Sequence, residues 1–258
     1  MALRLSTGIR NYMLQHGSVK HALQNGQIEV YSGTQPATAD AAITGTLLCT
    51  YTKSSAARTA EVLASGTITL TGTTGGVATV TVNGVNIIPQ GAVPFNTSLT
   101  QTAADLATAI NAGLSTPEYV ATSAVAVVTI KAMRGTGAGP NTFAVAGTYT
   151  GDMGGTYAAM SGGVTPVNGL TLASSAAGVI SKTASEVWTG VAAATGTAGW
   201  MRFVGSVADA GGLDTTESVL RVDGSVAVSG AQLNLSSTSM TSGATQTISS
   251  FSITMPAA

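Results

Sequence analysis

Charged residues are scarce in this chain. Asp, Glu, Lys and Arg make up 8% of its 258 residues, whereas an ordinary globular domain carries roughly a quarter. The formal net charge is −1, which gives no general electrostatic basis for binding nucleic acid or an anionic membrane. The surface therefore has to stay hydrated through hydroxyl and amide groups. Such a near-neutral surface favours association between subunits.

Cysteine and long apolar runs are also lacking. Cys49 is the single cysteine, which excludes a small scaffold held together by internal disulfides. The first residues, Met1 to Gly8, contain no apolar run typical of a signal peptide. The chain also contains no uninterrupted apolar run of about eighteen residues, so the sequence predicts no membrane-spanning helix.

The sequence offers little material for catalysis. His16 and His21 are the only histidines, and their separation across a helix break expected at Gly17 does not suit a metal pair on one helical face. No Gly-x-Ser-x-Gly motif occurs, and Cys49 has no evident catalytic partner. Residues Gly135–Asn141 look like a phosphate loop but lack its Lys-Ser/Thr ending, so we interpret them as a turn. We predict a protein that is not an enzyme and holds no cofactor.

In place of charged residues, the chain is rich in Gly, Ala, Ser, Thr and Val. Val and Thr favour strands and Gly marks turns, so the many short alternating runs predict a mainly β protein. We expect a β-sandwich of the jelly-roll or immunoglobulin-like kind. Its expected strands are 27–31, 46–52, 170–173, 186–190, 199–204, 219–222, 225–228, 232–235 and 247–255, with a tight hairpin at Asp223-Gly224.

Residues 61–167 differ in composition from the segments on either side. Asn83-Gly84 lies between two alternating runs and predicts a hairpin, because both turn residues need a positive φ. An apolar stripe predicts a helix over 99–114, capped by Ser98 or Thr100. The other expected strands are 66–71, 77–82, 85–88, 119–123, 125–131 and 142–146. We therefore predict a sandwich frame formed by 1–60 and 168–258, carrying an inserted α+β domain at 61–167.

The stretch Ala198–Val204 is expected to be the central strand of the frame. Trp200 and Arg202 fall on one face of it, and Phe203 falls on the other. An arginine beside a tryptophan in a strand is usually a structural ion-pair or cation–π residue. We predict a structural core that contains Trp188, Trp200, Arg202, Phe203 and Phe251.

Four acidic residues lie close together in the sequence between positions 209 and 223. Asp209, Asp214, Glu217 and Asp223 are the only candidates for a Ca²⁺ site, but their spacing does not match an EF-hand and favours a solvated loop. Arg202 or Arg221 could pair with one of these carboxylates. We therefore assign no metal site.

Helical spacing over 6–16 and 18–24 predicts a short N-terminal helical segment, with Ser6 or Thr7 as its first cap. We expect this segment to act as an arm in assembly. Its candidate contact residues are Arg4, Arg10, Tyr12 and Lys20.

Several ordered pieces of the chain resemble small virion proteins of tailed bacteriophages. In the frame these pieces are 5–11, 28–37, 45–48, 177–183, 188–203, 223–235 and 248–256. In the insert, Ala78–Ile87, Thr102–Asn111 and Gly135–Asn141 resemble a module found in several phage structural proteins. The resemblance implies a virion location and a structural subunit, with capsid decoration or cementing expected first and a head–tail collar or tail-fibre role as the alternative. The implied partners are major capsid, portal or collar, and tail proteins, together with further copies of this chain.

A function from another class also has to be considered. A module that binds carbohydrate on the host surface would use aromatic side chains as stacking platforms. Its candidates here are Trp188, Trp200, Tyr149 and Tyr157.

Overall fold

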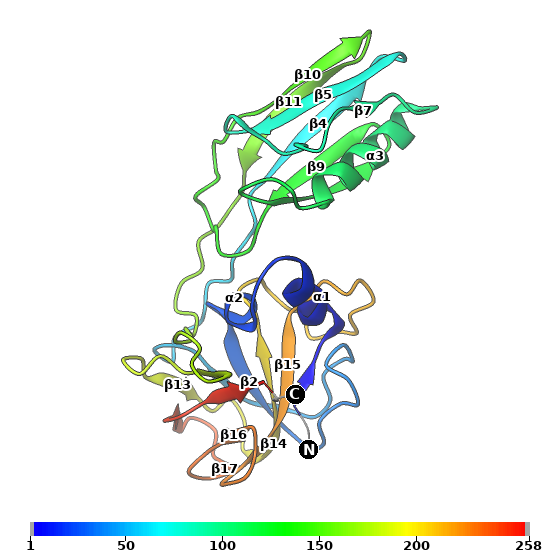
Figure 1. The fold of residues 1–258 in the computed structure, drawn as a ribbon. Helices are drawn as coiled ribbons and strands as arrows, with labels where there is room; N and C mark the ends of the chain where they lie inside the picture. The colour runs from blue at the N-terminus through cyan, green and yellow to red at the C-terminus, as the bar shows by residue number, and fades with distance from the viewer. Residues whose placement is uncertain (1–2, 256–258) are drawn as a thin grey trace. The chain divides into compact units, whose positions relative to one another are not determined.

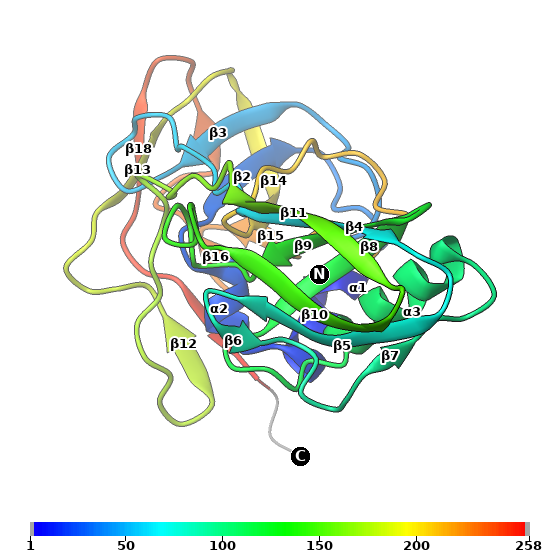
Figure 2. The ribbon, with the colours of Figure 1, turned by 90° about the horizontal axis from the view of Figure 1, so that it is seen from above.

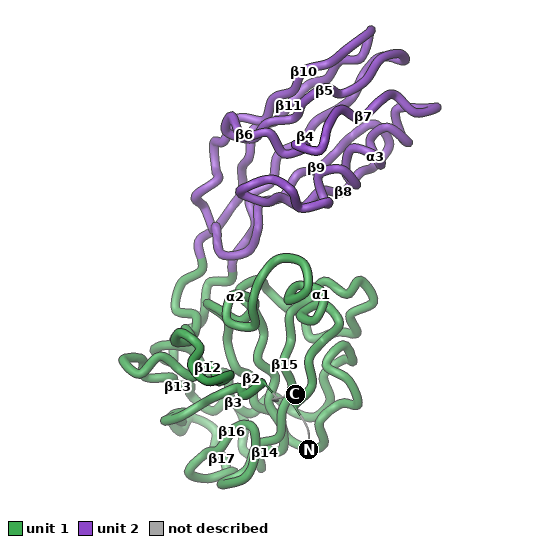
Figure 3. The backbone as a smooth tube through the Cα atoms, in the orientation of Figure 1, with its two compact units in different colours: residues 1–60, 166–258 green, residues 61–165 purple. Residues whose placement is uncertain are grey.

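The computed structural model describes residues 3–255 and is mainly β, with 42% strand and 11% helix. It divides into two compact units, Met1–Ala60 with Pro166–Ala258 and Glu61–Thr165. We call the first unit the frame and the second the insert (Figure 3). The insert was expected to extend to residue 167.

The main sheet of the frame combines strands from both sides of the insert (Figure 1). Its order is β1-β15-β14-β2-β3, with β16 paired to β15 and β17 paired to β14. The strands are β1 (Arg4–Leu5), β2 (Gln27–Ser32), β3 (Leu47–Tyr51), β14 (Gly196–Val204), β15 (Arg221–Ala227), β16 (Leu233–Asn234) and β17 (Ser239–Met240). All pairs are antiparallel except β15 with β16.

Two smaller sheets complete the sandwich. One pairs β12 (Val179–Ser181) with β19 (Ser252–Thr254), and the other pairs β13 (Trp188–Val191) with β18 (Thr245–Ile248). Single bridges, Cys49 with Ala192 and Thr52 with Thr189, connect β3 to β13. The expected strand 170–173 contributes only the bridges of Leu170 and Leu172.

An aromatic cluster fills the space between these layers. Phe203 on β14 lies 6.1 Å from Trp188 and 5.7 Å from Phe251, measured between ring centroids. Trp188 and Phe203 are fully buried, and Phe251 is nearly so. Large aromatic side chains contribute strongly to core energetics, so this cluster anchors the small sheets on the main one.

Strand β14 is central, with β15 on one side and β2 on the other. Both of its faces are buried from Trp200 to Val204. On the face opposite Phe203, Trp200 stacks on Tyr31 of β2 at a centroid distance of 4.6 Å. The same face holds Arg202, which is fully excluded from water.

The expected hairpin at Asp223-Gly224 is wrong, because β15 runs straight through it. The Asp223 side chain is held inside the frame by Arg202, which keeps the backbone extended. Gly224 is needed for space, since an added Cβ would lie 2.7 Å from the Cβ of Gln232 and 2.9 Å from the methyl group of Met201. The expected strands 219–222 and 225–228 are consequently one strand.

The N-terminal helices α1 (Thr7–Gln15) and α2 (Val19–Leu23) are capped by Ser6 and Ser18. This segment packs into the frame, and its expected role as an arm in assembly stays a prediction. Ile9 and Leu23 are fully buried. Ser6 donates its N–H to the carbonyl of Arg221 and accepts the Arg221 N–H at its hydroxyl.

The insert has two antiparallel four-stranded sheets and one helix, which pack around a shared core (Figure 2). One sheet contains β5 (Gly75–Val82), β6 (Val85–Asn86), β7 (Val93–Pro94) and β10 (Val145–Gly151). The other has the order β11-β4-β9-β8, with β4 (Ser65–Thr71), β8 (Tyr119–Ala124), β9 (Val127–Ala132) and β11 (Gly154–Ser161). Helix α3 (Leu99–Asn111) is capped by Ser98 and buries Leu106 and Ile110.

Strands β10 and β11, which follow each other in the chain but lie in different sheets, are the main elements that the sequence pattern missed. The expected strand 142–146 overlaps only the start of β10, and no strand was expected over 154–161. The reason is the burial pattern, since β11 is exposed or half-buried at every position except Met160 and has no apolar alternation.

Candidate functional site

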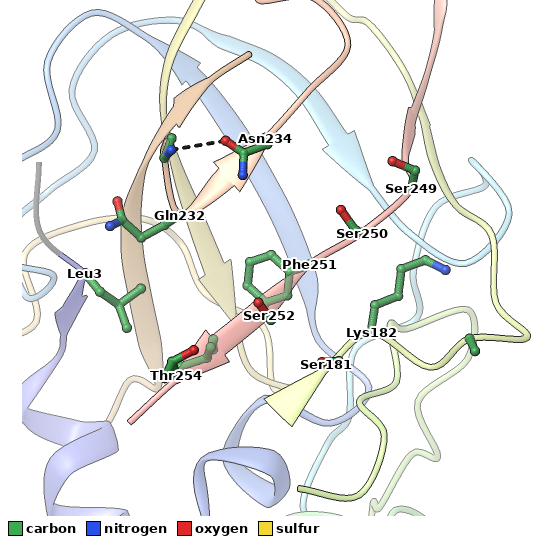
Figure 4. Close-up of a pocket in the computed structure, with 13 residues that line it drawn as sticks. Leu3, Ser181, Lys182, Gln232, Asn234, Ser249, Ser250, Phe251, Ser252 and Thr254 are labelled. Carbon is green, nitrogen blue, oxygen red and sulfur yellow. Dashed lines mark hydrogen bonds between the residues drawn. The ribbon is translucent and has the colours of Figure 1, made fainter. Parts of the chain in front are cut away.

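The frame contains a groove of about 690 Å³ beside its last strand (Figure 4). This volume lies within the range of ligand-binding clefts. The groove is lined by Leu3, Ser181, Lys182, Ala184, Ala231, Gln232, Asn234, Ser249, Ser250, Phe251, Ser252, Ile253 and Thr254. Most of these side chains are uncharged and carry a hydroxyl or an amide group.

Local chain geometry places the two amides of the groove. Gly224 has no side chain, so the segment around Gln232 lies close against β15. Gln232 Oε1 accepts the N–H of Ser225 at 3.0 Å and its hydroxyl at 2.6 Å. Asn234 Oδ1 accepts the N–H of Ala231 at 3.1 Å. Both carbonyl oxygens are therefore used within the frame.

Lys182 is the single charged residue of the lining. Its ammonium group donates to the backbone carbonyl of Glu186 and to that of Thr183. It also lies 5.9 Å from the ring centroid of Trp188. The frame therefore uses two of its hydrogen-bond donors, and Lys182 is the one positive charge in an otherwise uncharged lining.

Each of the four carboxylates considered for Ca²⁺ binds a different partner within the chain. Asp209 pairs with Arg221 at 2.6 Å, and Asp223 pairs with Arg202 at 2.8 Å. Asp214 accepts the backbone N–H groups of Thr216 and Val219, and Glu217 accepts from the Asn11 amide. Among residues 3–255, no cluster of three or more His, Cys, Asp or Glu side chains could hold a metal ion.

The two buried ion pairs share a cap of backbone carbonyls. Arg202 and Arg221 both donate to the carbonyls of Ala39 and Ala41. Burial acts to raise the pKa of Asp209, but hydrogen bonds from Arg221 and from the Gly211 N–H outweigh it and hold that pKa below its ordinary value. Both arginines are therefore structural groups in this fold.

The glycine-rich turn 135–141 surrounds a carboxylate of the same chain. Glu61 is 1% exposed, and its Oε1 accepts the N–H of Gly135 at 2.8 Å and that of Gly137 at 2.9 Å. Backbone N–H groups arranged in this way bind anions well. Sequence reasoning did not single out Glu61, since a lone carboxylate far along the chain from the turn gives no local signal.

Burial decides which aromatic residues can contact a ligand. Trp188 and Trp200 are fully buried, so the expectation of stacking platforms there is wrong. Tyr149 and Tyr157 remain near the surface of the insert, where the Tyr157 side chain is 37% exposed. Tyr157 donates its hydroxyl to the hydroxyl of Tyr149 at 2.8 Å.

The suggested assembly residues differ in accessibility. Arg10 is exposed, Arg4 and Lys20 are half-buried, and Tyr12 is 6% exposed. Tyr12 is therefore not a surface contact, and its hydroxyl lies 2.8 Å from Nδ1 of His21. Its ring packs in the helical hairpin because Gly17 leaves room beside it.

Cys49 is buried in β3, and burial raises the pKa of its thiol to about 11. The thiol is therefore protonated at neutral pH and is not poised as a nucleophile.

No helix within the described residues has the length and apolar character required to span a membrane. Comparison of the chain with family models, curated proteins and solved structures finds no match.

Proposed function

We propose that this chain is a structural subunit of a bacteriophage virion, with capsid decoration or cementing as its first role. The frame attaches to the particle and the insert is carried as a separate unit. The proposal draws on the resemblance of the ordered frame and insert motifs to tailed-phage virion proteins. Its partners are the major capsid protein, portal, collar or tail proteins, and further copies of this chain.

One structural observation carries the proposal. Strands β2 and β14, which lie on opposite sides of the insert in sequence, pair directly over several residues. The frame sheet is therefore complete without any strand of the insert, and the insert has its own buried core. A chain built in this way can keep one unit for attachment and use the other for neighbour contacts.

The charge distribution supports an assembly role. The buried arginines and acidic residues of the frame neutralise one another inside it. Residues 224–258 carry no charge, which leaves a surface suited to close packing through hydroxyl and amide groups.

Quantitative mass spectrometry of purified particles tests the proposal. A copy number on the order of hundreds supports capsid decoration, while about a dozen or fewer supports a collar or tail position, as expected for a ring. If the chain is missing from intact particles, the proposal is wrong.

A host-surface carbohydrate module is the second candidate, and the partial exposure of Tyr157 is the observation that favours it. Saturable binding on a glycan array that is lost in Tyr157→Ala supports this alternative. Tyr119→Ala, which changes a buried tyrosine of the same unit, is the control for general damage to the insert.

A further inference from the structure

We infer that the groove beside β19 binds an uncharged, extended polypeptide segment of a neighbouring subunit, which enters as an added strand. This inference rests on the proposed virion function, because that function supplies the neighbour. The binding mode itself depends on the strand geometry of the groove.

One edge of β19 is free. Lys182 donates its N–H to the carbonyl of Phe251, and Met255 donates to that of Gly178, while Ile180 and Ile253 are register partners. Because alternate residues of an antiparallel strand turn their backbone groups to the same side, residues 251, 253 and 255 face β12. The N–H and C=O groups of Ser252 and Thr254 therefore face away from it. Within residues 3–255, β12 is the only strand paired with β19.

This edge lacks three common protections against strand addition, namely charge, proline and a bulge. Native edges are commonly blocked by lysine, proline, a bulge or a covering element. The run Thr247–Met255 contains neither charge nor proline, and the pairing of β19 shows no register shift. Ser252 and Thr254 also line the groove, so space lies beside them.

The opposite side of the groove supplies further donors. The carbonyl oxygens of Gln232 and Asn234 are held by the frame, which leaves their amide nitrogens for a ligand. In Figure 4 the amide nitrogen of Asn234 points toward Phe251, at the centre of the view. Amide donors suit the carbonyl oxygens of an extended backbone.

Charge and aromatic content define the occupant. Lys182 is the one charge of the lining and is held by two backbone carbonyls, so the groove offers a strongly charged segment no set of counter-charges. Phe251 is 5% exposed, so its ring offers little surface for sugar stacking. A neutral extended peptide uses the free strand edge, which a sugar does not require, and strand addition is a general mode of peptide recognition.

The test uses the full-length protein and a synthetic peptide of alternating threonine and valine, blocked at both ends. In amide NMR spectra, we expect saturable shifts at Ser252 and Thr254 on titration. The same peptide methylated on alternate backbone nitrogens should bind at least about tenfold more weakly. Equal binding of the two peptides, or no saturable shift, overturns the inference.

Two variants separate the backbone from the side chain. Ser252→Pro removes the outward N–H and leaves the residues that bond β12 intact, so binding should fall at least about tenfold. Ser252→Ala keeps the N–H and should bind within about twofold of the native chain. If Ser252→Pro does not fold, the methylated peptide still decides the question on the native protein.

A neutral oligosaccharide is the competing occupant. If maltohexaose shifts the same amides and displaces the peptide, the groove is a sugar site and the inference is wrong. Absence of the chain from virions would overturn the proposed function without changing the peptide titration. Conversely, a chain present on particles that binds no peptide overturns only the inference about the groove.

Discussion

Arg202 and Asp223 lie directly opposite each other on β14 and β15, and both side chains are fully excluded from water. Arg202 Nε donates to Asp223 Oδ1 and Nη2 donates to Oδ2, each at 2.8 Å. The guanidinium group also lies 5.5 Å from the ring centroid of Trp200. Burial raises the pKa of Asp223, and the nearby Arg202 opposes that effect. The centre of the frame is therefore an ion pair whose two members depend on each other.

Removing one member of this pair should destabilise the frame strongly. Arg202→Met leaves the Asp223 carboxylate buried without its partner, and we expect the free energy of unfolding to fall by about 3–5 kcal/mol. Urea unfolding followed by tryptophan fluorescence measures this loss, because both tryptophans lie in the frame. Arg10→Met, at an exposed position, should change stability by less than about 0.5 kcal/mol. A similar small change in both variants would show that the pair is not important for stability.

The carboxylate inside the glycine-rich turn should control the order of that turn. Glu61→Ala removes the acceptor of the Gly135 and Gly137 N–H groups, at a cost of about 1–3 kcal/mol. We expect amide hydrogen exchange at both glycines to accelerate by about tenfold or more. Glu61→Gln retains a carbonyl acceptor and should cause a smaller acceleration. Unchanged exchange in Glu61→Ala would mean that the turn holds its shape independently.

Two glycines should respond to alanine for different reasons. At Gly84 an added Cβ meets no atom within 4 Å, but φ is +80°, so Gly84→Ala should cost about 1 kcal/mol through backbone conformation. At Gly190 the added Cβ would lie 2.2 Å from the Thr50 carbonyl oxygen, so the β3–β13 contact should open at a cost of about 1–3 kcal/mol.

Tryptophan fluorescence distinguishes these two effects, because Gly84 lies in the insert and Gly190 in the frame. Only Gly190→Ala should shift the urea midpoint seen by this signal. A shift caused by Gly84→Ala instead would show that the stabilities of the two units are linked.

Low pH should weaken the insert through Asp152. Its carboxylate accepts hydrogen bonds from the side chain of Thr74 and from the backbone N–H groups of Thr73 and Thr74, which lower its pKa from 3.8 to about 2. Because the folded state favours the ionised form, this stabilisation is complete above the ordinary pKa and is lost as the pH falls from about 4 toward 2.

A carboxyl NMR titration should therefore give a midpoint for Asp152 near pH 2. Asp152→Asn carries no charge, so the protection of amides in β10 and β11 should depend less on pH over the same window. Asp105→Asn, elsewhere in the insert, serves as the matched control. A midpoint near 3.8 would contradict the hydrogen-bonded geometry.

Local features were predictable from the sequence where they depend on nearby residues. Ser6 and Ser98 cap their helices because a serine hydroxyl accepts an N–H three residues later. Asn83-Gly84 forms its turn because both residues adopt positive φ values. The fold class also followed from alternation, because buried and exposed positions in a strand repeat every two residues.

Features that depend on distant contacts were not predictable in this way. Asp223-Gly224 has the composition of a turn, but the buried Arg202 and the close approach of Gln232 keep it in a strand. Strand β11 lacks an apolar pattern, and its pairing with β4 places it in the sheet.

A mainly β chain with few charges, capped helices and a tight hairpin in its middle part could be predicted from the sequence, since each feature depends on composition or on neighbours along the chain. Only the folded structure shows that the N-terminal helices bury Ile9 and Leu23 in the frame and that Glu61 fills the glycine-rich turn. It also shows that β19 has a free edge beside a groove whose lining carries a single charge. These features arise when segments far apart in the sequence exclude water together, and no local pattern encodes which segments meet.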